Sequence, residues 1–360
     1  MEDIRIMDSG NIGFVMLCAA FVFFMTPGLS CFYGGLVRRK NAVNTMFTSV
    51  VTIATGIVMW MLIGYSLSFG PDHGGVIGDF SWFGLEGVSL TEPYVEGQGI
   101  PNMVFCLFQM MFAVITPALI TGSVAGRMKF KSLFVFLVLW SLVVYYPMAH
   151  MVWADGGFLA KIGSVDFAGG NVVHISSGIT ALTLCILLGK RYDYKRANYK
   201  IHNMPMVALG AFILLFGWFG FNAGSALAAD GLAAHAFVTT AVSSAAAMLS
   251  WMFCDVVVNK KPTFVGACTG MVAGLVGITP GAGFVPIWAA LIIGLTTSPI
   301  CFFMISWVKE KFGYDDALDA FGCHASAVSG AVSAPVYSAK FPSMTSGREM
   351  VCSSATQSFS

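Results

Sequence analysis

The sequence predicts an all-α membrane protein, a polytopic helical bundle, and three observations support this class. Of the 360 residues, 57% are hydrophobic and only 10% are charged, whereas an ordinary soluble domain is about 25% charged. Several apolar stretches reach the length of about 20 residues with which a helix crosses the hydrocarbon of a bilayer. The net charge is +1, which leaves no basic patch for nucleic acid. Because so much of the chain is apolar, we expect the lipid bilayer to surround it.

Nine apolar segments qualify as membrane-spanning helices. In order along the chain they are 11–35, 43–69, 101–126, 132–151, 171–189, 204–224, 234–257, 264–280 and 285–308. A weaker tenth segment begins near residue 318. The first segment is too long for the core of a signal peptide and follows a net acidic flank, so we expect it to remain as a helix.

The Lys and Arg residues predict the orientation of these segments. The connections after the first, third, fifth, seventh and ninth segments hold 15 of the 19 Lys and Arg residues. The long connection 70–100, which follows the second segment, has five carboxylates and no Lys or Arg. By the positive-inside rule, the odd-numbered connections are cytoplasmic and the N-terminus is outside.

The cysteines indicate neither a metal site nor a cofactor. The nine cysteines lie mostly within apolar segments and include no C-x-x-C pair, so we interpret them as packing residues. The sequence also has no nucleophile elbow, metal-spaced His/Glu pair or phosphate loop, which disfavours an intramembrane enzyme.

Two histidines inside apolar segments indicate a transport pathway. His174 lies in DFAGGNVVHISSG, after Asp166, and His324 lies in DDALDAFGCH, after Asp319. Polar side chains in a bilayer are energetically costly and are usually retained for a task. Each histidine follows a carboxylate near a helix start, and the two lie five segments apart, in the fifth and the tenth. This spacing favours inverted repeats, two halves of the chain that meet at one pathway.

Motifs along the chain agree in order and spacing with those of one family. They are DFAGGNVVH (166–174), DDALDAFGCH (315–324), CFYGGLVRRKN (31–41), AHMVW (149–153), GWFGFNAGS (217–225) and VGITP (276–280). Over about residues 11–324 the chain resembles the ammonium transporter/Rhesus protein family. The resemblance implies a transporter-like transmembrane domain over this range, with about 10 helices where the family has 11.

The resemblance also implies an ammonium/ammonia channel and a set of pore residues. These would be Trp153, Phe112 and Ser225 at an external cation site, Phe221 with Phe112 at a phenylalanine gate, Phe108 one helical turn from Phe112, the twin histidines His174 and His324, Trp218 on the pore wall, and Asp166 as a buried acidic residue. Aromatic faces would attract ammonium, which would lose its proton at the gate and cross an apolar pore as ammonia.

Further expectations concern partners and location. The resemblance implies ammonium or ammonia as substrate, methylammonium as an analogue, a homotrimer, and a small nitrogen-regulatory signalling protein as a family partner. The expected location is the cell inner (plasma) membrane, as a multi-pass protein. One alternative function is an ammonium sensor or receptor that uses the same cation site.

Residues 325–360 depart from the family pattern. This tail is rich in Ser and Ala and has no Leu or Ile, so it predicts a poor tenth helix and no eleventh. One base deleted from codons for Gly-Ile-Gly-Gly-Ile-Trp-Gly would produce Ala-Ser-Ala-Val-Ser-Gly, the residues at 325–330. We therefore hypothesise a frameshifted or truncated product. In such a product His324 would not be held on a proper pore helix, and the contact with the signalling protein would be lost. The alternative to a working channel is then a non-functional truncated family member.

Overall fold

The computed structural model describes residues 7–194, 196 and 199–332, with side chains described as far as residue 329. This part of the chain consists of helices joined by turns and loops, and its only strand-like pairing is an isolated bridge between His73 and Ile77. Nine helical segments in it are long and apolar enough to cross a membrane. The predicted fold class, an all-α polytopic helical bundle, is confirmed.

The nine segments each contain one or more consecutive helices. They are Ser9–Leu36 (α1), Arg39–Phe69 (α2 Ala42–Met59 and α3 Tyr65–Phe69), Asn102–Ile120 (α4), Phe130–Lys161 (α5 Phe130–Trp140, α6 Tyr146–Trp153 and α7 Phe158–Lys161), Gly170–Leu188 (η5 Gly170–Ile175 and α8 Ser176–Leu188), Met204–Ala226 (α9 Met204–Ala223), Gly231–Asn259 (α10), Phe264–Gly281 (α11 Phe264–Ile278) and Ile287–Phe312 (α12 Ile287–Phe303 and α13 Lys309–Phe312). A further helix, α14, spans Ala320–Val332.

Predicted and observed segments differ most at the ends of the third and fourth. The third is predicted to reach residue 126, but α4 ends at Ile120 and residues 121–127 form turns. In these turns the Ser123 hydroxyl donates to the Ile120 carbonyl, a local bond that competes with helix continuation. The fourth is predicted to end at residue 151, but α6 continues to Trp153 and the segment extends through α7 to Lys161.

Polar residues begin four of the long helices. The side chains of Asp8, Asn203, Asp230 and Thr263 each accept a hydrogen bond from a backbone N–H in the first turn of α1, α9, α10 and α11 respectively. Such a bond satisfies a donor that has no partner within the helix, and stabilises the helix by about 1 kcal/mol. The polar residues between apolar segments therefore determine where these helices begin.

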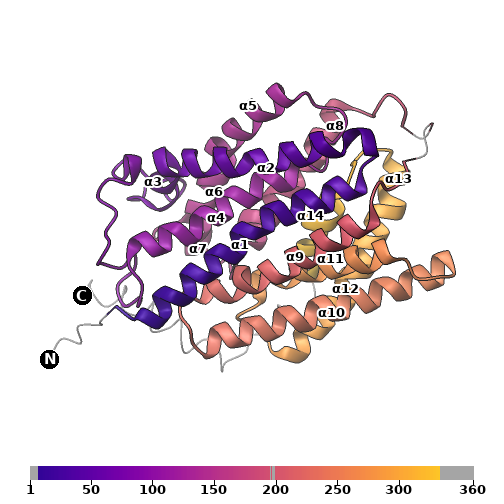
Figure 1. The fold of residues 1–360 in the computed structure, drawn as a ribbon. Coiled ribbons are helices and arrows are strands. Elements are labelled where there is room, and N and C mark those ends of the chain that lie inside the picture. Colours follow the sequence, from indigo (N-terminus) through magenta and orange to yellow (C-terminus); the bar gives the residue numbers. More distant parts are fainter. Residues whose placement is uncertain (1–6, 195, 197–198, 333–360) are drawn as a thin grey trace.

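Helices α1 and α9 pack closely against each other through glycine (Figure 1). A Cβ atom on Gly210 of α9 would lie 2.3 Å from the backbone nitrogen of Phe32 in α1, so this approach requires glycine. On α11, Gly270 and Gly274 face α10 in the same way. Small residues let membrane helices approach closely where lipid removes the hydrophobic drive for association.

The basic connections meet at one end of the bundle. Arg38, after the first segment, contacts Asp193, after the fifth, at 2.5 Å. Arg191, after the fifth, donates two hydrogen bonds to Asp315, after the ninth. At the opposite end, the backbone N–H of Asp8, just before α1, donates a hydrogen bond to the carbonyl of Gly99 in the acidic connection 70–100. The two ends of the bundle therefore differ in charge as the loop pattern predicts.

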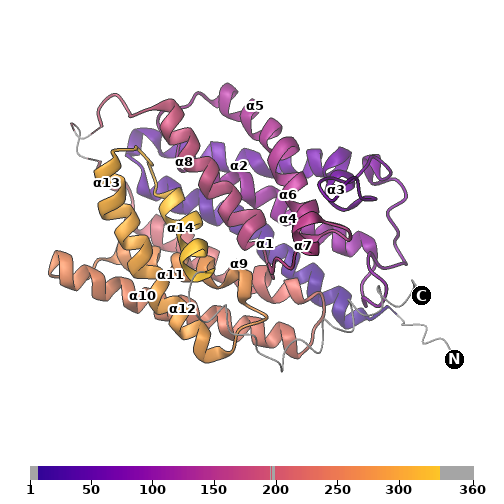
Figure 2. The same ribbon diagram turned by 180° about the vertical axis from the view of Figure 1, so that it is seen from behind.

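Helix α14 is the tenth long element, and Figure 2 shows it beside α8 and α12. A Cβ atom on Gly178 of α8 would lie 2.6 Å from the backbone nitrogen of Ala325. The Ser/Ala-rich start of the tail thus continues a helix that contains His324, because Ala has a high helix propensity and fits this close approach. The domain boundary expected after residue 324 falls inside α14. The rest of the tail, 333–360, lies outside the described residues.

Candidate functional site

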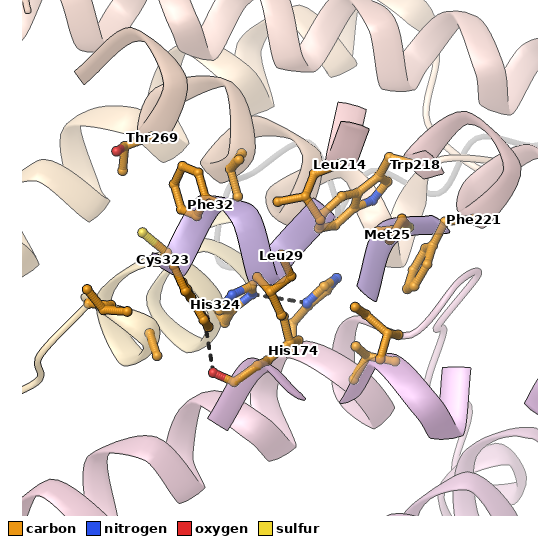
Figure 3. Close-up of a pocket in the computed structure, with 17 residues that line it drawn as sticks. Met25, Leu29, Phe32, His174, Leu214, Trp218, Phe221, Thr269, Cys323 and His324 are labelled. Carbon is orange, nitrogen blue, oxygen red and sulfur yellow. Dashed lines mark hydrogen bonds between the residues drawn. The ribbon is translucent and has the colours of Figure 1, made fainter. Parts of the chain in front are cut away.

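Two histidines meet within the bundle. The Nδ1 atom of His174 lies 3.3 Å from the Nδ1 atom of His324, although 150 positions separate them in the chain. The two rings are stacked, with centroids 5.3 Å apart and an interplanar angle of 12°. Both side chains are buried, and Figure 3 shows them side by side at a cavity. The structure therefore brings together the two histidines that the sequence singles out.

Asp166 caps the segment that carries His174. Its carboxylate accepts hydrogen bonds of 2.5–3.3 Å from the backbone N–H groups of Gly169, Gly170, Asn171 and Val172. Gly169 has a φ of +112°, which favours glycine, and leads the chain into the π-helical η5. Burial raises the pKa of the Asp166 carboxyl, while the four N–H groups act in the opposite direction.

Asp316 has the corresponding place before His324. As in the first motif, the carboxylate lies eight residues before the histidine; it is buried, and its Oδ2 accepts the N–H of Phe321 at 2.8 Å. Burial raises the pKa of Asp316. Asp319, the carboxylate singled out from the sequence, directly precedes α14 as expected of a residue near a helix start, but it has a φ of +58° and its carboxylate bonds Lys309. The eight-residue spacing shared by both motifs could have identified Asp316.

Aromatic rings continue from His174 toward the acidic end of the bundle. The centroid of Phe221 lies 5.9 Å from that of His174 and 4.3 Å from that of Phe112. Phe112 makes an edge contact of 5.8 Å with Trp153, whose Nε1 donates to the backbone carbonyl of Asp166 at 3.0 Å. Phe112 and Phe221 are each 1% exposed, whereas Trp153 is half-buried. We call the line Trp153, Phe112, Phe221, His174 and His324 the aromatic column.

Phe108 and Ser225 lie beside the aromatic column. The ring of Phe108 contacts that of Phe112, with centroids 5.0 Å apart. The half-buried Ser225 donates its hydroxyl to the carbonyl of Phe221 at 2.9 Å. Because a hydroxyl keeps acceptor capacity when it donates, Ser225 can still accept a hydrogen bond from a small cation.

Trp218 stands against His174, with ring centroids 5.3 Å apart, and its Nε1 donates to the Thr279 hydroxyl at 2.9 Å. The cavity next to these rings has a mainly apolar lining that includes Leu29 and Leu214 (Figure 3). The Nε2 atom of His174 has no hydrogen-bond partner among the described residues. An unpaired ring nitrogen beside an apolar cavity can bond a small polar molecule.

All nine residues predicted for the site lie on the aromatic column or in contact with it. Within the described part of the chain, no group of three or more His, Cys, Asp or Glu side chains is placed to hold a metal ion. The polar side-chain atoms at the cavity are ring nitrogens, hydroxyls and the Cys323 thiol, and the nitrogens and hydroxyls suit reversible hydrogen bonding to a small molecule.

Comparisons with known proteins match the chain over most of its length. The model of the Ammonium Transporter Family matches residues 13–357. The ammonium transporter of Bacillus subtilis is 48% identical over 318 residues, which cover 88% of this chain and 78% of that protein. The crystal structure of Saccharomyces cerevisiae Mep2 has a TM-score of 0.83 and 37% identity, covering 92% of this chain and 76% of that one. A structure described as a sensor Amt protein has a TM-score of 0.83 and 27% identity, covering 92% and 83%.

Proposed function

Because this chain belongs to the ammonium transporter family, a family of multi-span membrane transporters and not of enzymes, we propose that it conducts ammonium or ammonia through the aromatic column. The observation that carries the proposal is the continuity of this column, with neighbouring ring centroids 4.3–5.9 Å apart from Trp153 to His324. One end offers aromatic faces to a cation, and the other offers imidazole nitrogens to a neutral molecule.

Trp153, Phe112 and Ser225 form the external site that recruits ammonium. Ammonium is a compact cation, and aromatic faces attract such a cation by about 0.5–2 kcal/mol. The half-buried Trp153 leads to the buried Phe112, so the ion exchanges water for aromatic faces step by step. The Ser225 hydroxyl accepts one of the hydrogen bonds that ammonium gives up in leaving water.

Phe112 and Phe221 form the gate at which the ion loses its proton, with Phe108 packed behind. Both gate rings are buried, and moving a bare ion past them costs several kcal/mol or more. A Lys amine has a pKa of about 10.4, which burial can lower by about 3–5 units, so ammonium can deprotonate here at neutral pH. Potassium has no proton to lose and is therefore rejected.

His174 and His324 carry ammonia through the lumen, with Trp218 on its wall. Two nitrogens 3.3 Å apart form a hydrogen bond only when one donates, so one ring holds its proton on Nδ1 and the other on Nε2. The outward-facing nitrogens are then one acceptor and one donor. Ammonia can donate to the first and accept from the second, and the shared proton offers a relay path.

Family membership also supports proposals about assembly and location. We expect a homotrimer in the cell inner (plasma) membrane, methylammonium as an analogue substrate, and a nitrogen-regulatory signalling protein as partner. The cap that Asp166 makes at the start of η5 would keep His174 in place during transport.

A second candidate function is ammonium sensing through the same cation site. It is supported by the likeness to the structure described as a sensor Amt protein. A sensor requires ammonium binding but not flux, so a saturable cellular response in a variant without uptake would favour this function.

The deciding experiment is methylammonium uptake in a host that lacks its own ammonium transporters. Wild-type chain should take up methylammonium, and His174→Ala should abolish uptake at equal membrane expression. His73→Ala, in the exposed external loop, is the matched control and should keep wild-type uptake. No uptake by the well-expressed wild-type chain would contradict the channel function and leave sensing as the better candidate.

A further inference from the structure

The indole of Trp218 is held from behind by the turn that follows α11. Its Nε1 donates to the Thr279 hydroxyl at 2.9 Å, and that hydroxyl donates in turn to the carbonyl of Leu275, one helical turn earlier, at 2.8 Å. A threonine hydroxyl has a single proton, so Thr279 can only accept from the indole. Thr279 and Trp218 are both buried, with 0% and 2% of their surfaces exposed. The two bonds therefore form a directed chain that fixes the orientation of the indole.

The same turn also contacts the start of the segment that carries His174. The carbonyl of Pro280 accepts the backbone N–H of Phe167 at 2.9 Å. A Cβ atom on Gly170, the first residue of η5, would lie 2.6 Å from the Cβ atom of Pro280, so the proline ring abuts the backbone there. Adjacent residues of one turn thus support both Trp218 and the segment of His174, and the contact between these two rings depends on this turn.

Trp218 presents no polar hydrogen to the cavity. An indole has one hydrogen-bond donor and no acceptor, and Thr279 accepts that donor. The indole lies nearly parallel to the ring of His174, at an interplanar angle of 15° and with centroids 5.3 Å apart. Among the described side chains that line the cavity, only those of Trp218, His174 and His324 contain nitrogen (Figure 3). With the indole N–H engaged, the two imidazoles are the nitrogen sites left for a small molecule.

A free indole N–H would change the chemistry of this wall. A buried donor without a partner is unfavourable, so an indole released from Thr279 would turn its N–H toward the cavity, where water or ammonia can accept the hydrogen bond. Ammonia has a single lone pair, so a molecule bonded to the indole cannot accept from an imidazole at the same time. Ammonia held at the wall in this way would move through the pore more slowly.

We propose that Thr279 is a positioning residue: it accepts the indole N–H of Trp218, keeps this donor out of the cavity and holds the indole face against His174. The imidazoles of His174 and His324 are then the groups that bond ammonia in the cavity. This inference rests on the proposed role of the two histidines in carrying ammonia. It assigns to Thr279 an effect on the rate of conduction and none on the recruitment of ammonium, because recruitment occurs at Trp153, on the other side of the gate.

The first test compares Thr279→Val with Thr279→Ser in methylammonium uptake, in cells without their own ammonium transporters and at equal membrane expression. Valine has nearly the shape of threonine but no hydroxyl, so the indole N–H loses its acceptor. We expect the maximal rate to fall roughly five- to tenfold, the equivalent of one buried hydrogen bond left unmade, at an unchanged KM. Serine retains the hydroxyl, so Thr279→Ser should keep most of the wild-type rate.

Thr297→Val is the matched control. Thr297 lies on α12, is as fully buried as Thr279, and its hydroxyl donates to the Ile293 carbonyl of its own helix at 2.7 Å. The substitution removes the same hydroxyl at equal burial but strands no indole N–H, so uptake should follow the wild type. A similar fall in rate in Thr297→Val would mean that the loss of any buried hydroxyl slows transport, and would contradict the role of Thr279.

A double-mutant cycle with Trp218→Phe, measured by thermal unfolding of the purified full chain, gives a readout independent of transport. Phenylalanine keeps an aromatic ring but has no N–H, so Thr279→Val strands no donor in that background. Thr279→Val should therefore lower the unfolding temperature of the wild-type chain more than that of Trp218→Phe. Equal losses in both backgrounds would show that the hydroxyl supports the turn and not the indole, and would overturn the inference.

The rate and the unfolding temperature together separate this inference from the proposed function. If the cycle shows coupling but Thr279→Val conducts at the wild-type rate, the bond orients the indole without any effect on ammonia, and the inference is overturned. If His174→Ala also retains uptake, the proposed role of the histidines fails, and the inference fails with it. A lower rate in Thr279→Val, together with coupling and with rescue by Thr279→Ser, would establish Thr279 as the positioning residue.

Discussion

Asp166 and Asp316 hold equivalent places, because each lies eight residues before one of the two stacked histidines and accepts a backbone N–H at the start of the segment that carries it. They differ in how fully their oxygens are used. Asp166 accepts four N–H groups with its two oxygens. Asp316 accepts through Oδ2, and its Oδ1 has no hydrogen-bond partner in the described part of the chain. The two carboxylates therefore occupy equivalent positions, but only Asp166 has hydrogen-bond partners for both of its oxygens.

This difference predicts that Asp166→Asn destabilises the protein more than Asp316→Asn. In the first variant an amide NH2 group faces N–H donors, and each lost charge-assisted bond costs about 1.5–3 kcal/mol. In the second, the amide oxygen can still accept from Phe321 while the NH2 group takes the unpaired side, so the cost should stay below about 1 kcal/mol. Thermal unfolding of both purified variants measures the difference, and equal losses would contradict it.

Much of the fold is predictable because the bilayer imposes a length and an apolar composition on every segment. The nine segments follow from this constraint, and the alternation of basic and non-basic connections between them follows from the positive-inside rule. The aromatic column is not predictable from composition or periodicity, since nothing there places Phe221 4.3 Å from Phe112; only the family motifs suggest it. Three carboxylates lie within DDALD before His324, and the sequence alone does not show which of them is the buried cap; burial, which follows from the fold, selects Asp316.

Helix α14 exposes a limit of hydropathy as a predictor. Residues 325–332 lack Leu and Ile, yet they continue a helix, because Ala325 fits against Gly178 where a larger residue would not. The frameshift hypothesis for the tail stays a prediction, since 333–360 lie outside the described residues. Reading the gene tests it: an uninterrupted frame without a family-like alternative nearby would contradict it.

Gly178→Ala should displace α14 from α8. The added Cβ atom would lie 2.6 Å from a backbone nitrogen that cannot rotate away, and such overpacking costs about 1–3 kcal/mol. Because His324 precedes Ala325 directly, methylammonium uptake should fall together with thermal stability. Gly13→Ala in α1, where a Cβ meets open space, should change neither. Wild-type uptake and stability in Gly178→Ala would contradict the close packing.

Arg191→Gln should destabilise the basic end of the bundle in a pH-dependent way. Burial acts to raise the pKa of Asp315, but the hydrogen bonds from Arg191 and the charges of Arg191 and Arg127 outweigh it, and the pKa is lowered. A lowered carboxyl pKa stabilises the fold above the unfolded value of about 3.9, and this stabilisation is lost as pH falls through the folded pKa. The loss on mutation should therefore be largest at neutral pH.

We expect this loss to be about 2 kcal/mol at pH 7, below the 3–5 typical of a stranded buried charge, because Arg127 remains 4.0 Å from Asp315. Thermal unfolding of the variant and the wild type between about pH 2 and pH 7, a range that includes the window below the unfolded pKa of about 3.9, measures it. Lys200→Gln, an exposed charge of the same connection, is the control and should have little effect. A loss of equal size at all pH values would mean that the ion pair is not its source.

Trp153 should determine the affinity for the cation rather than the rate of conduction. Trp153→Leu removes the aromatic face and should raise the KM of methylammonium uptake roughly 2- to 30-fold, the equivalent of about 0.5–2 kcal/mol. Trp153→Phe keeps an aromatic face and loses only the bond to the Asp166 carbonyl, so its KM should rise less. The maximal rate should stay near wild type in both, because the gate and the histidines are unchanged. Equal KM values for the Leu and Phe variants would exclude ring attraction as the cause. A fall in maximal rate at constant KM would mean that Trp153 acts on the rate of conduction and not on recruitment of the cation.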